Sequence, residues 1–254
     1  MMIDEGTYKR IYSELRSYRD IERLSRIYTD RTREFFLVIY TQKMIRQVTQ
    51  NYHRVRSKTK KLQERWRSGR TLLEISEDIS FPPVMTAFLI LTNDGYGKKT
   101  FRRMLNDPSR IDDRRLRREL IEVAENDPIY SPEGNRVQRE RGVWGEEMIR
   151  RWLEKKNITY RSEEDLRAEG KKTPDFLFER PLFYRGEEVN WIESKASFGD
   201  LKEINKNLDK QLLAYRKLFG PGMVIYWFGF VDTAPLIEGI IIETEGVLKG
   251  PWDI

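Results

Sequence analysis

Apolar positions recur at helical spacing through most of the first half of the chain. In REFFLVIYTQKMIRQV, residues 33–48, the side chains of Phe36, Ile39, Tyr40 and Val48 fall on one face of a helix. No good run of alternating apolar and polar positions interrupts the first 130 residues. The pattern therefore predicts an all-α N-terminal region.

A break in this pattern divides residues 68–91 into two short segments. The first segment is amphipathic and the second is apolar, and the helical pattern is interrupted between Ser80 and Pro83. The proline falls in the first turn of the second helix, where proline is tolerated. Two short helices around a tight turn are the outline of a helix-turn-helix, whose second helix enters a major groove. Many helical bundles share this outline, but basic residues on both flanks favour the DNA-contacting interpretation.

The pattern changes after NDPIYSPEGN, residues 126–135, whose prolines, glycine and asparagines are typical of a loop. A domain boundary here separates residues 1–130 from residues 131–254. The second part alternates helices and strands, which predicts an α/β sandwich with a mixed sheet and an α+β protein overall. Helices are expected over 141–157 and 201–219, strands over 158–161, 173–179, 189–195, 223–231 and 236–245, and a turn over 180–188.

Composition limits the chemistry. At 254 residues the chain can form one large or two ordinary domains, and its lack of cysteine excludes disulfides, zinc–cysteine sites and thiol catalysis. The one histidine, His53, lies among basic residues and is expected on the surface rather than in a catalytic site. A metal site must therefore use carboxylates, which favours Mg²⁺ or Mn²⁺ over zinc. The absence of an apolar signal core and of an 18-residue apolar run predicts an intracellular protein, cytoplasmic or nucleoid-associated, without a membrane span.

Positive charge is concentrated in the first half. Residues 1–140 hold 29 Lys and Arg against 21 Asp and Glu, a net charge of +8, whereas residues 141–254 hold 18 against 20, a net charge of −2. A solvated helix face is one explanation, but so large an imbalance favours an anionic partner. The residues predicted to contact nucleic acid are Arg54, Arg56, Lys58, Lys60, Lys61, Arg65, Arg67, Arg70, Lys98 and Lys99.

Charged residues stand where a buried strand should be apolar. Asp175 begins one expected strand, and Glu193 and Lys195 end the next, so the three can meet if the two strands pair. Glu193 and Lys195 are two positions apart and therefore share a face. Two buried carboxylates repel each other unless a cation compensates them, so a divalent metal is one explanation. A structural ion-pair cluster is the other.

A third carboxylate favours the metal. Glu146 precedes Ile149 and Leu153 by three and seven positions, which places it on the buried stripe of its helix rather than on the solvent face. Its neighbour Glu147 is turned about 100° further round and is expected to be more exposed.

The motif D-(x17)-E-S-K, preceded by a helix-borne glutamate, resembles the PD-(D/E)XK nuclease superfamily. RGVWGEEMIRRWLEKKNITYRSEE resembles its archaeal Holliday-junction-resolvase branch. LRAEGKKTPDFLFERP, VNWIESKASFGD and KQLLAYRKLFGPGMVIYWFGF resemble more closely the TPD-motif family, which comprises archaeal proteins and the animal codanin-interacting nuclease. The similarity covers the second domain, and the helical first half agrees with that family's helix-turn-helix region.

The resemblance implies a restriction-endonuclease-like fold and a role for each matching residue. Asp175, Glu193 and Glu146 would be metal ligands and Lys195 the catalytic lysine, with Mg²⁺ as the cofactor and Mn²⁺ as its substitute. Gln211 and Tyr215 match a Q-x-x-x-Y element that would position the lysine or contact a phosphate. For Tyr215, ordinary packing of the helix on the sheet explains the position equally well.

The function predicted from these features is hydrolysis of DNA phosphodiester bonds, selective for branches, flaps or ends. The family resemblance implies products with a 5′-phosphate and a 3′-hydroxyl. Two alternatives stay open: a binding scaffold that uses the nuclease fold to contact a protein partner, and a nuclease directed at RNA. Resolvases act as dimers, so a homodimer is among the options for assembly. The sequence selects neither the DNA structure nor the oligomeric state.

Overall fold

The protein divides into two compact units. The computed structural model describes residues 1–163, 165 and 173–253; the LRAEGKK stretch of the family resemblance, residues 166–172, lies outside them. Unit 1 consists of residues 1–40 and 140–254, and unit 2 of residues 41–139. The hydrophobic pattern places a single cut between residues 130 and 131, whereas residues 1–40 here belong with the C-terminal part of the chain. The DNA-binding and nuclease roles of the two predicted ranges stay predictions.

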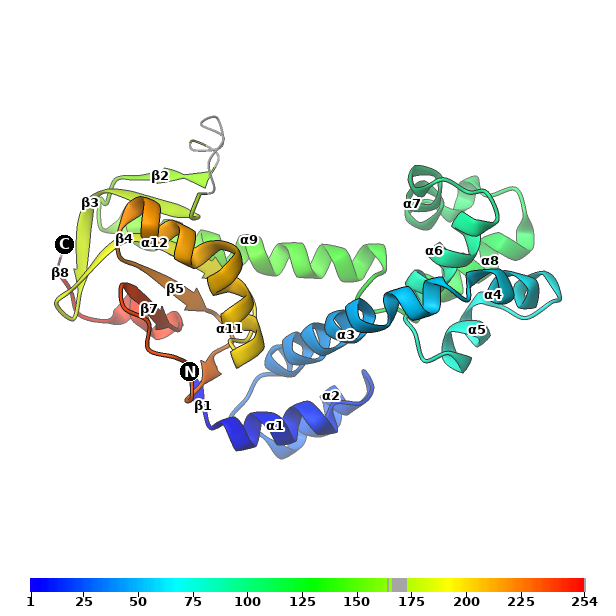
Figure 1. Ribbon diagram of the computed structural model, residues 1–254, viewed down its shortest axis with the longest axis horizontal. Coiled ribbons are helices and arrows are strands. Elements are labelled where there is room, and N and C mark those ends of the chain that lie inside the picture. The colour runs from blue at the N-terminus through cyan, green and yellow to red at the C-terminus, as the bar shows by residue number, and fades with distance from the viewer. Residues whose placement is uncertain (164, 166–172, 254) are drawn as a thin grey trace. The chain divides into compact units, whose positions relative to one another are not determined.

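Unit 1 is built on a mixed sheet with helices on both faces (Figure 1). Its strands follow the order β2-β3-β4-β5-β7, with β8 beside β3; the β2–β3, β3–β4 and β3–β8 pairs are antiparallel, and β4–β5 and β5–β7 are parallel. The elements are β1 (Met2–Ile3), α1 (Glu5–Glu14), α2 (Asp20–Ile27), the start of α3 (Arg33–Arg56), most of α9 (Pro132–Lys155), β2 (Tyr160–Ser162), β3 (Phe176–Tyr184), β4 (Glu187–Lys195), α11 (Leu201–Asn207), the π-helical turn η2 (Leu208–Leu212), α12 (Leu213–Phe219), β5 (Gly222–Tyr226), β6 (Phe230–Val231), β7 (Ile240–Glu243), η3 (Glu245–Lys249) and β8 (Trp252–Asp253).

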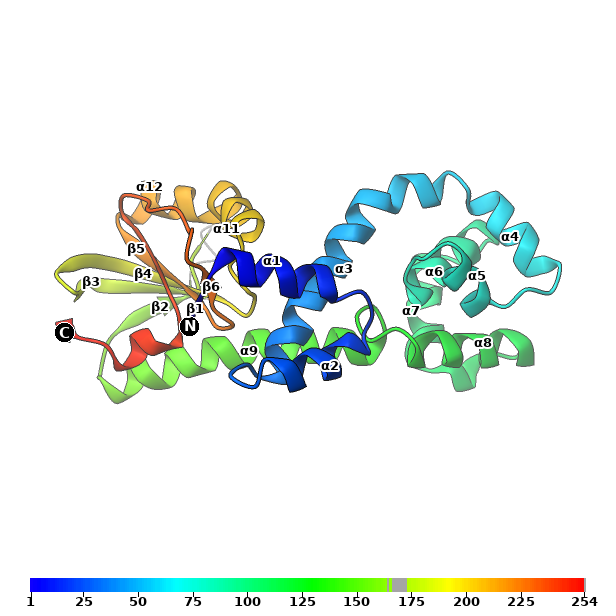
Figure 2. The same ribbon diagram turned by 90° about the horizontal axis from the view of Figure 1, so that it is seen from below.

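Two hydrophobic layers cover the sheet, one on each face. On one side α9 packs Ile149 and Leu153 against alternate residues of β3, β4 and β5. On the other side Leu212 and Tyr215 of the helical segment from α11 to α12 pack against Trp191. Figure 2 shows α9 and the α11–α12 segment on opposite sides of the sheet. Strand β5 is buried along its whole length between β4 and β7. The strand expected over residues 223–231 is too long, because β5 ends at Tyr226 and Phe230–Val231 form β6, which pairs with β1 instead.

The hairpin of β3 and β4 is longer than the sequence pattern predicts. The expected turn over residues 180–188 is wrong, because β3 continues to Tyr184 and the turn itself is Arg185–Gly186. Both turn residues have positive φ, 51° and 82°, as a tight two-residue hairpin loop requires. Pro181 is tolerated inside β3 because the strand register shifts between Leu177 and Leu182.

The first 40 residues pack against the C-terminal part of the sheet. Strand β1 pairs in parallel with β6, Met2 opposite Phe230. The ring of Tyr8 stacks on Phe198 with 4.9 Å between ring centroids, and its hydroxyl donates a hydrogen bond to the Asp200 carboxylate. Asp200 also caps α11 by accepting from the Glu203 N–H, so its position serves packing and capping.

Unit 2 is helical, in agreement with the apolar pattern. Its members are the end of α3, α4 (Thr59–Arg67), α5 (Leu72–Asp78), α6 (Pro83–Asn93), α7 (Lys98–Asn106), the 3₁₀ turn η1 (Pro108–Arg110), α8 (Arg114–Glu125) and the start of α9. Helix α6, PVMTAFLILTN, carries no charged residue and lies at the centre of one hydrophobic cluster. Two helices and a turn therefore exist at residues 72–93, while a DNA-reading role for α6 stays a prediction.

The loop predicted over residues 126–135 ends earlier than expected. Helix α9 begins at Pro132, and the Ser131 side chain accepts a hydrogen bond from the Gly134 N–H at 3.0 Å. A serine cap followed by proline is a helix start. The residues SPEGN, whose composition is typical of a loop, therefore form the cap and first turn of α9.

Candidate active site

The register of β3 and β4 brings two of the predicted site residues together. Phe176 lies opposite Ile192, so Asp175, just before β3, lies opposite Glu193. The Ser194 N–H donates to Asp175 Oδ2 at 2.7 Å, and the Asp175 N–H donates to Glu193 Oε2 at 3.3 Å. The two carboxylates are thus held by reciprocal bonds to each other's strand.

Lys195 joins this pair on the face that the two-residue spacing predicts. Its Nζ donates to Glu193 Oε1 at 2.5 Å and to Gln211 Oε1 at 2.8 Å. Trp191 shares that face and packs in the cluster with Tyr215, whereas Ile192 packs on the opposite side with α9. The lysine side chain is 18% exposed and that of Glu193 only 4%, so the charges are largely withdrawn from water.

Burial and mutual repulsion perturb both carboxylates. Desolvation, and next the charge of Glu193, raise the pKa of Asp175 well above its usual range. Desolvation also raises the pKa of Glu193, against the opposing effect of the Lys195 charge. Ionising both carboxyls therefore costs more free energy in this site than in water, because the fold alone does not fully compensate the two charges.

This repulsion leads to a prediction about stability. A carboxyl whose pKa is higher in the folded than in the unfolded state makes the free energy of unfolding fall as pH rises from the unfolded value of about 4 through the folded value. We expect Asp175→Asn, which keeps an oxygen acceptor for the Ser194 N–H, to be more stable than the wild type at about pH 8 in EDTA, with the difference shrinking toward about pH 5. Denaturant unfolding at both pH values measures it.

The control for this prediction is an aspartate of the opposite kind. The exposed Asp165 accepts hydrogen bonds from the Ser162 N–H and hydroxyl, which lower the pKa of its carboxyl. Its stabilising effect is therefore present above its unfolded pKa, and Asp165→Asn should not stabilise the chain at about pH 8. An Asp175→Asn chain less stable than wild type at that pH in EDTA would contradict the account.

Gln211 reaches the lysine from an irregular part of its helix. The segment from α11 to α12 contains the π-helical turn Leu208–Leu212, in which Gln211 lies. Such turns occur often at functional sites, because the extra residue changes the direction of the side chains. Tyr215, one turn later, is buried, and its ring lies edge-on to the Trp191 ring with 5.5 Å between ring centroids. Desolvation, and next the charges of Glu193 and Asp175, raise the pKa of its hydroxyl.

Glu146 approaches the same strand end from α9. It is half-buried, and desolvation followed by the charge of Glu163 raises its pKa, while Arg150 and Lys195 lower it. Glu147 instead forms ion pairs with Arg150 and Arg151 at 3.0 and 2.8 Å, in agreement with a position closer to the surface.

A glycine lets α9 come this close. A Cβ on Gly145 would lie 2.5 Å from Trp227 Nε1 and 2.9 Å from Ser194 Oγ, two atoms joined by a 2.8 Å hydrogen bond. Ser194 separates Glu193 from Lys195 in the chain. The glycine therefore fixes the distance from α9 to the strand that carries the site.

The sequence patterns missed Glu163. Its charge raises the pKa of Glu146, of Glu193 and of Tyr215, so it contributes negative potential to this site. The only sequence signal is its place in the acidic run SEED after the short strand β2. A surface run of acids gives no reason to expect a site residue.

The donor set fits a hard divalent cation. Two buried carboxylates with raised pKa values supply oxygen ligands whose repulsion a cation would relieve. Over residues 1–163, 165 and 173–253, no three acidic or histidine side chains are close enough to hold a metal ion together. The structure thus brings together Asp175 and Glu193, and Glu146 lies outside a ready-made set of three.

The ten cations predicted to contact nucleic acid all lie in unit 2 and form two groups. Three are held by carboxylates: Arg65 and Arg70 by Asp78, and Arg67 by Asp94. The other seven are exposed, with no ion pair to any described residue: Arg54, Arg56, Lys58, Lys60, Lys61, Lys98 and Lys99.

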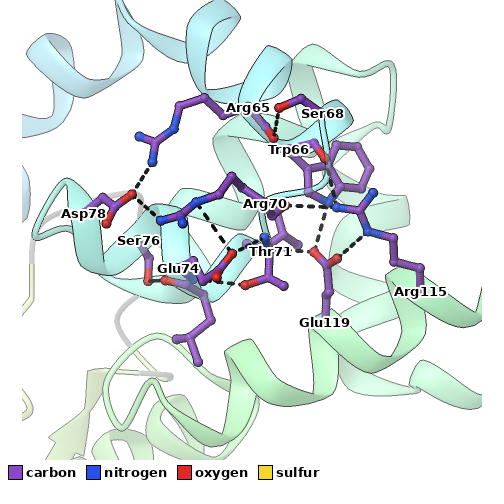
Figure 3. Close-up of polar contacts among 12 residues, drawn as sticks. Arg65, Trp66, Ser68, Arg70, Thr71, Glu74, Ser76, Asp78, Arg115 and Glu119 are labelled. Atoms are coloured by element: carbon purple, nitrogen blue, oxygen red, sulfur yellow. Dashed lines mark hydrogen bonds and ion pairs between the residues drawn. The ribbon is translucent and has the colours of Figure 1, made fainter.

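Figure 3 shows two members of the first group, Arg65 and Arg70, in their ion pairs. Arg65 and Arg70 both point at Asp78, across the turn from α4 to α5. Beside them the buried Glu119 accepts bonds from Trp66 Nε1 at 2.9 Å, Arg115 Nε at 2.6 Å and the Leu72 N–H at 3.0 Å (Figure 3). This buried carboxylate therefore accepts three hydrogen bonds, one of them from the cationic Arg115.

Among the helices described, none combines the length and apolar character needed to span a bilayer. The predicted intracellular location stays a prediction.

Comparison with known proteins places this arrangement in a family. Residues 112–245, more than half of the chain, match the family model described as "Protein of unknown function TPD sequence-motif". The chain is 37% identical over 169 residues to a Mus musculus protein named CDAN1-interacting nuclease 1 and 36% identical over 169 residues to the Homo sapiens protein of that name. In both cases the alignment covers 63% of this chain and 60% of the relative.

The Gallus gallus protein of the same name is 29% identical over 232 residues, covering 84% of this chain and 81% of the relative. No solved structure matches. The chain spans about 60% of the length of the mammalian relatives. The region matched by the family model contains Glu146, Asp175, Glu193 and Lys195. By the extent of the family match, the chain belongs to the TPD sequence-motif family.

Proposed function

We propose that the protein is a metal-dependent nuclease of the PD-(D/E)XK type that hydrolyses phosphodiester bonds in DNA. The observation that carries the proposal is the cluster at the start of β3 and the end of β4. Asp175 and Glu193 face each other, and Lys195 lies between Glu193 and Gln211. The relatives' printed name, which calls those proteins nucleases, supports the same chemistry.

Asp175 and Glu193 would hold the metal ion, Mg²⁺ or in its place Mn²⁺, with Glu146 as a third acidic group from α9. When bound, the ion supplies an activated water and neutralises charge on the phosphate. The raised pKa values of both carboxyls support this assignment, since a cation would remove the cost of ionising them.

The remaining residues would position the substrate phosphate and the attacking water. Lys195 can donate a hydrogen bond to the charge that develops on the phosphate, and its low exposure strengthens that interaction. Gln211 holds the ammonium group at 2.8 Å, and Tyr215 fixes its helix against Trp191. Lys195 acts on the reacting group, whereas Gln211 acts through Lys195.

The exposed cations of unit 2 bear on the class of substrate. The seven exposed cations of unit 2 offer a sequence-independent grip on phosphates, which is salt-sensitive. We expect magnesium-dependent cleavage in a labelled panel of single strand, duplex, splayed arm, flap and four-way junction, with matched RNA strands beside the DNA. Cleavage of a DNA in the panel supports the proposal; cleavage confined to RNA would replace it with the RNA-directed alternative.

A partner-binding scaffold is the second candidate, because the relatives' printed name records an interaction with CDAN1. The same panel separates the two candidates. Nucleic-acid binding without cleavage in Mg²⁺ or Mn²⁺ would favour the scaffold. The complete acid–acid–lysine set supports the nuclease instead.

A further inference from the structure

Two adjoining hollows open on unit 2, with volumes of about 600 Å³ and about 480 Å³. One lies among α6, α7 and the start of α9, and the other among the end of α3, the start of α4, α6 and the loop before α7. They share Phe88 and Lys98, and we call them together the α6–α7 groove. Each hollow has the size of a small-molecule binding site.

Aromatic rings line the groove from several elements. Besides the buried Phe101 of α7 there are four: Tyr52 of α3, Phe88 of α6, Tyr96 of the loop before α7, and Tyr130 before α9. All four are half-buried and rest on the hydrophobic core of unit 2, so their positions are fixed on one side while part of each ring remains accessible. Phe88 is held further by an edge contact with Phe101 at 5.4 Å between ring centroids.

The charged side chains that line the groove are all positive. Arg56, Lys98, Arg102 and Arg139 are exposed and form no ion pair with any residue in the described part of the chain. No aspartate or glutamate lines either hollow among those residues, although the chain has 41 acidic side chains in total. Unlike Arg65 and Arg70, which form ion pairs with Asp78, these four cations are available to an external anion.

We propose that the α6–α7 groove binds unpaired nucleotides of single-stranded nucleic acid, with bases stacked on the aromatic rings and phosphates held by the four cations. Aromatic rings interleaved with cations are the elements of single-strand recognition. Paired bases in a duplex have no free face to offer such rings, so the groove distinguishes a single strand from a duplex. This deepens the proposed function and rests on it for the choice of nucleic acid; it adds that the substrate carries an unpaired segment.

Fluorescence anisotropy of the full chain in EDTA tests the proposal without cleavage. The probes are labelled oligothymidylate of about 16 nucleotides, a length sufficient for single-strand sites, and a duplex of equal length. We expect tighter binding of the single strand, and a loss of about tenfold with Tyr96→Ala, since stacking contributes about 1–3 kcal/mol per base. Tyr96→Phe, which keeps the ring, should bind as the wild type does.

The cations have their own test. Arg102→Gln with Arg139→Gln should reduce the slope of log affinity against log salt by about two, one for each phosphate that the variant no longer neutralises. The matched control is Lys155→Gln with Lys156→Gln, two exposed cations of unit 1, which should leave single-strand binding unchanged. Thermal melts of every variant confirm folding.

Three results would overturn the proposal: equal affinity for strand and duplex, wild-type binding by folded Tyr96→Ala, or displacement of the oligonucleotide by a much lower concentration of an acidic peptide. The nuclease is judged separately. Cleavage of duplex DNA with magnesium, without a preference for the single strand in EDTA, would overturn the single-strand site and support the proposed nuclease. Single-strand binding that depends on Tyr96, without cleavage in any divalent metal, would support the single-strand site and overturn the proposed nuclease.

Discussion

Lys195→Met is expected to lower the rate of DNA cleavage by about 10²- to 10³-fold, the usual effect of removing one preorganised donor from a transition state. Methionine keeps most of the volume of the lysine but has no ammonium group to contact Glu193 and Gln211. Substrate binding, measured in calcium, should change little, because the seven exposed cations that we expect to grip phosphates lie in unit 2. Single-turnover cleavage and anisotropy separate the two effects.

The matched control is Lys202→Met on α11. Lys202 is exposed and forms no ion pair with a described residue, so its loss should leave the rate within about twofold of wild type. Equal cleavage rates for Lys195→Met and wild type would exclude Lys195 from the reaction. The cluster at the end of β4 would then be the structural ion-pair network that the sequence also allows.

Gly145→Ala is expected to lower the free energy of unfolding and the cleavage rate together. The new methyl group would have to displace Trp227 or push α9 away from the sheet. Trp227 is only 6% exposed and donates a hydrogen bond to Ser194, so it has little freedom to move. Overpacking of this kind costs about 1–3 kcal/mol. A displaced α9 also moves Glu146 relative to Glu193, so magnesium-dependent cleavage should fall even in conditions where the variant is folded.

Gly142, one turn earlier on α9, provides the control. A Cβ there would have no atom within 4 Å, so Gly142→Ala should raise stability by about 0.5–1 kcal/mol, because alanine loses less backbone entropy in a helix than glycine does. Denaturant melts of the two variants should therefore move in opposite directions. A neutral or stabilising Gly145→Ala would contradict the close approach of α9 to Ser194.

Much of the candidate site follows from local pattern. Asp175 stands at the start of one apolar run and Glu193 near the end of the next. Strands that are close in sequence usually pair, so the approach of these two carboxylates could be predicted. The shared face of Glu193 and Lys195 follows from the two-residue period of a strand. Glu146 could be placed on the sheet side because Ile149 and Leu153 define that side of its helix.

Other features depend on contacts that sequence patterns do not encode. The π-helical turn that directs Gln211 to Lys195 leaves the amphipathic period almost unchanged. The packing of Tyr8 on Phe198 joins residues 190 positions apart, so nothing local separates residues 1–40 from the rest of the helical half. Arg65 and Arg70 look like phosphate ligands by charge alone, and only the approach of Asp78 shows that they are already neutralised.

Metal-dependent DNA hydrolysis is tested most directly by one cleavage assay. Wild type and Asp175→Asn are incubated with the same labelled branched DNA in magnesium and in EDTA, with Asp165→Asn as the control for a substituted aspartate. We expect cleavage by wild type and Asp165→Asn in magnesium alone, and none by Asp175→Asn, although that variant binds the DNA. Cleavage in EDTA, or cleavage by Asp175→Asn at the wild-type rate in magnesium, would contradict it.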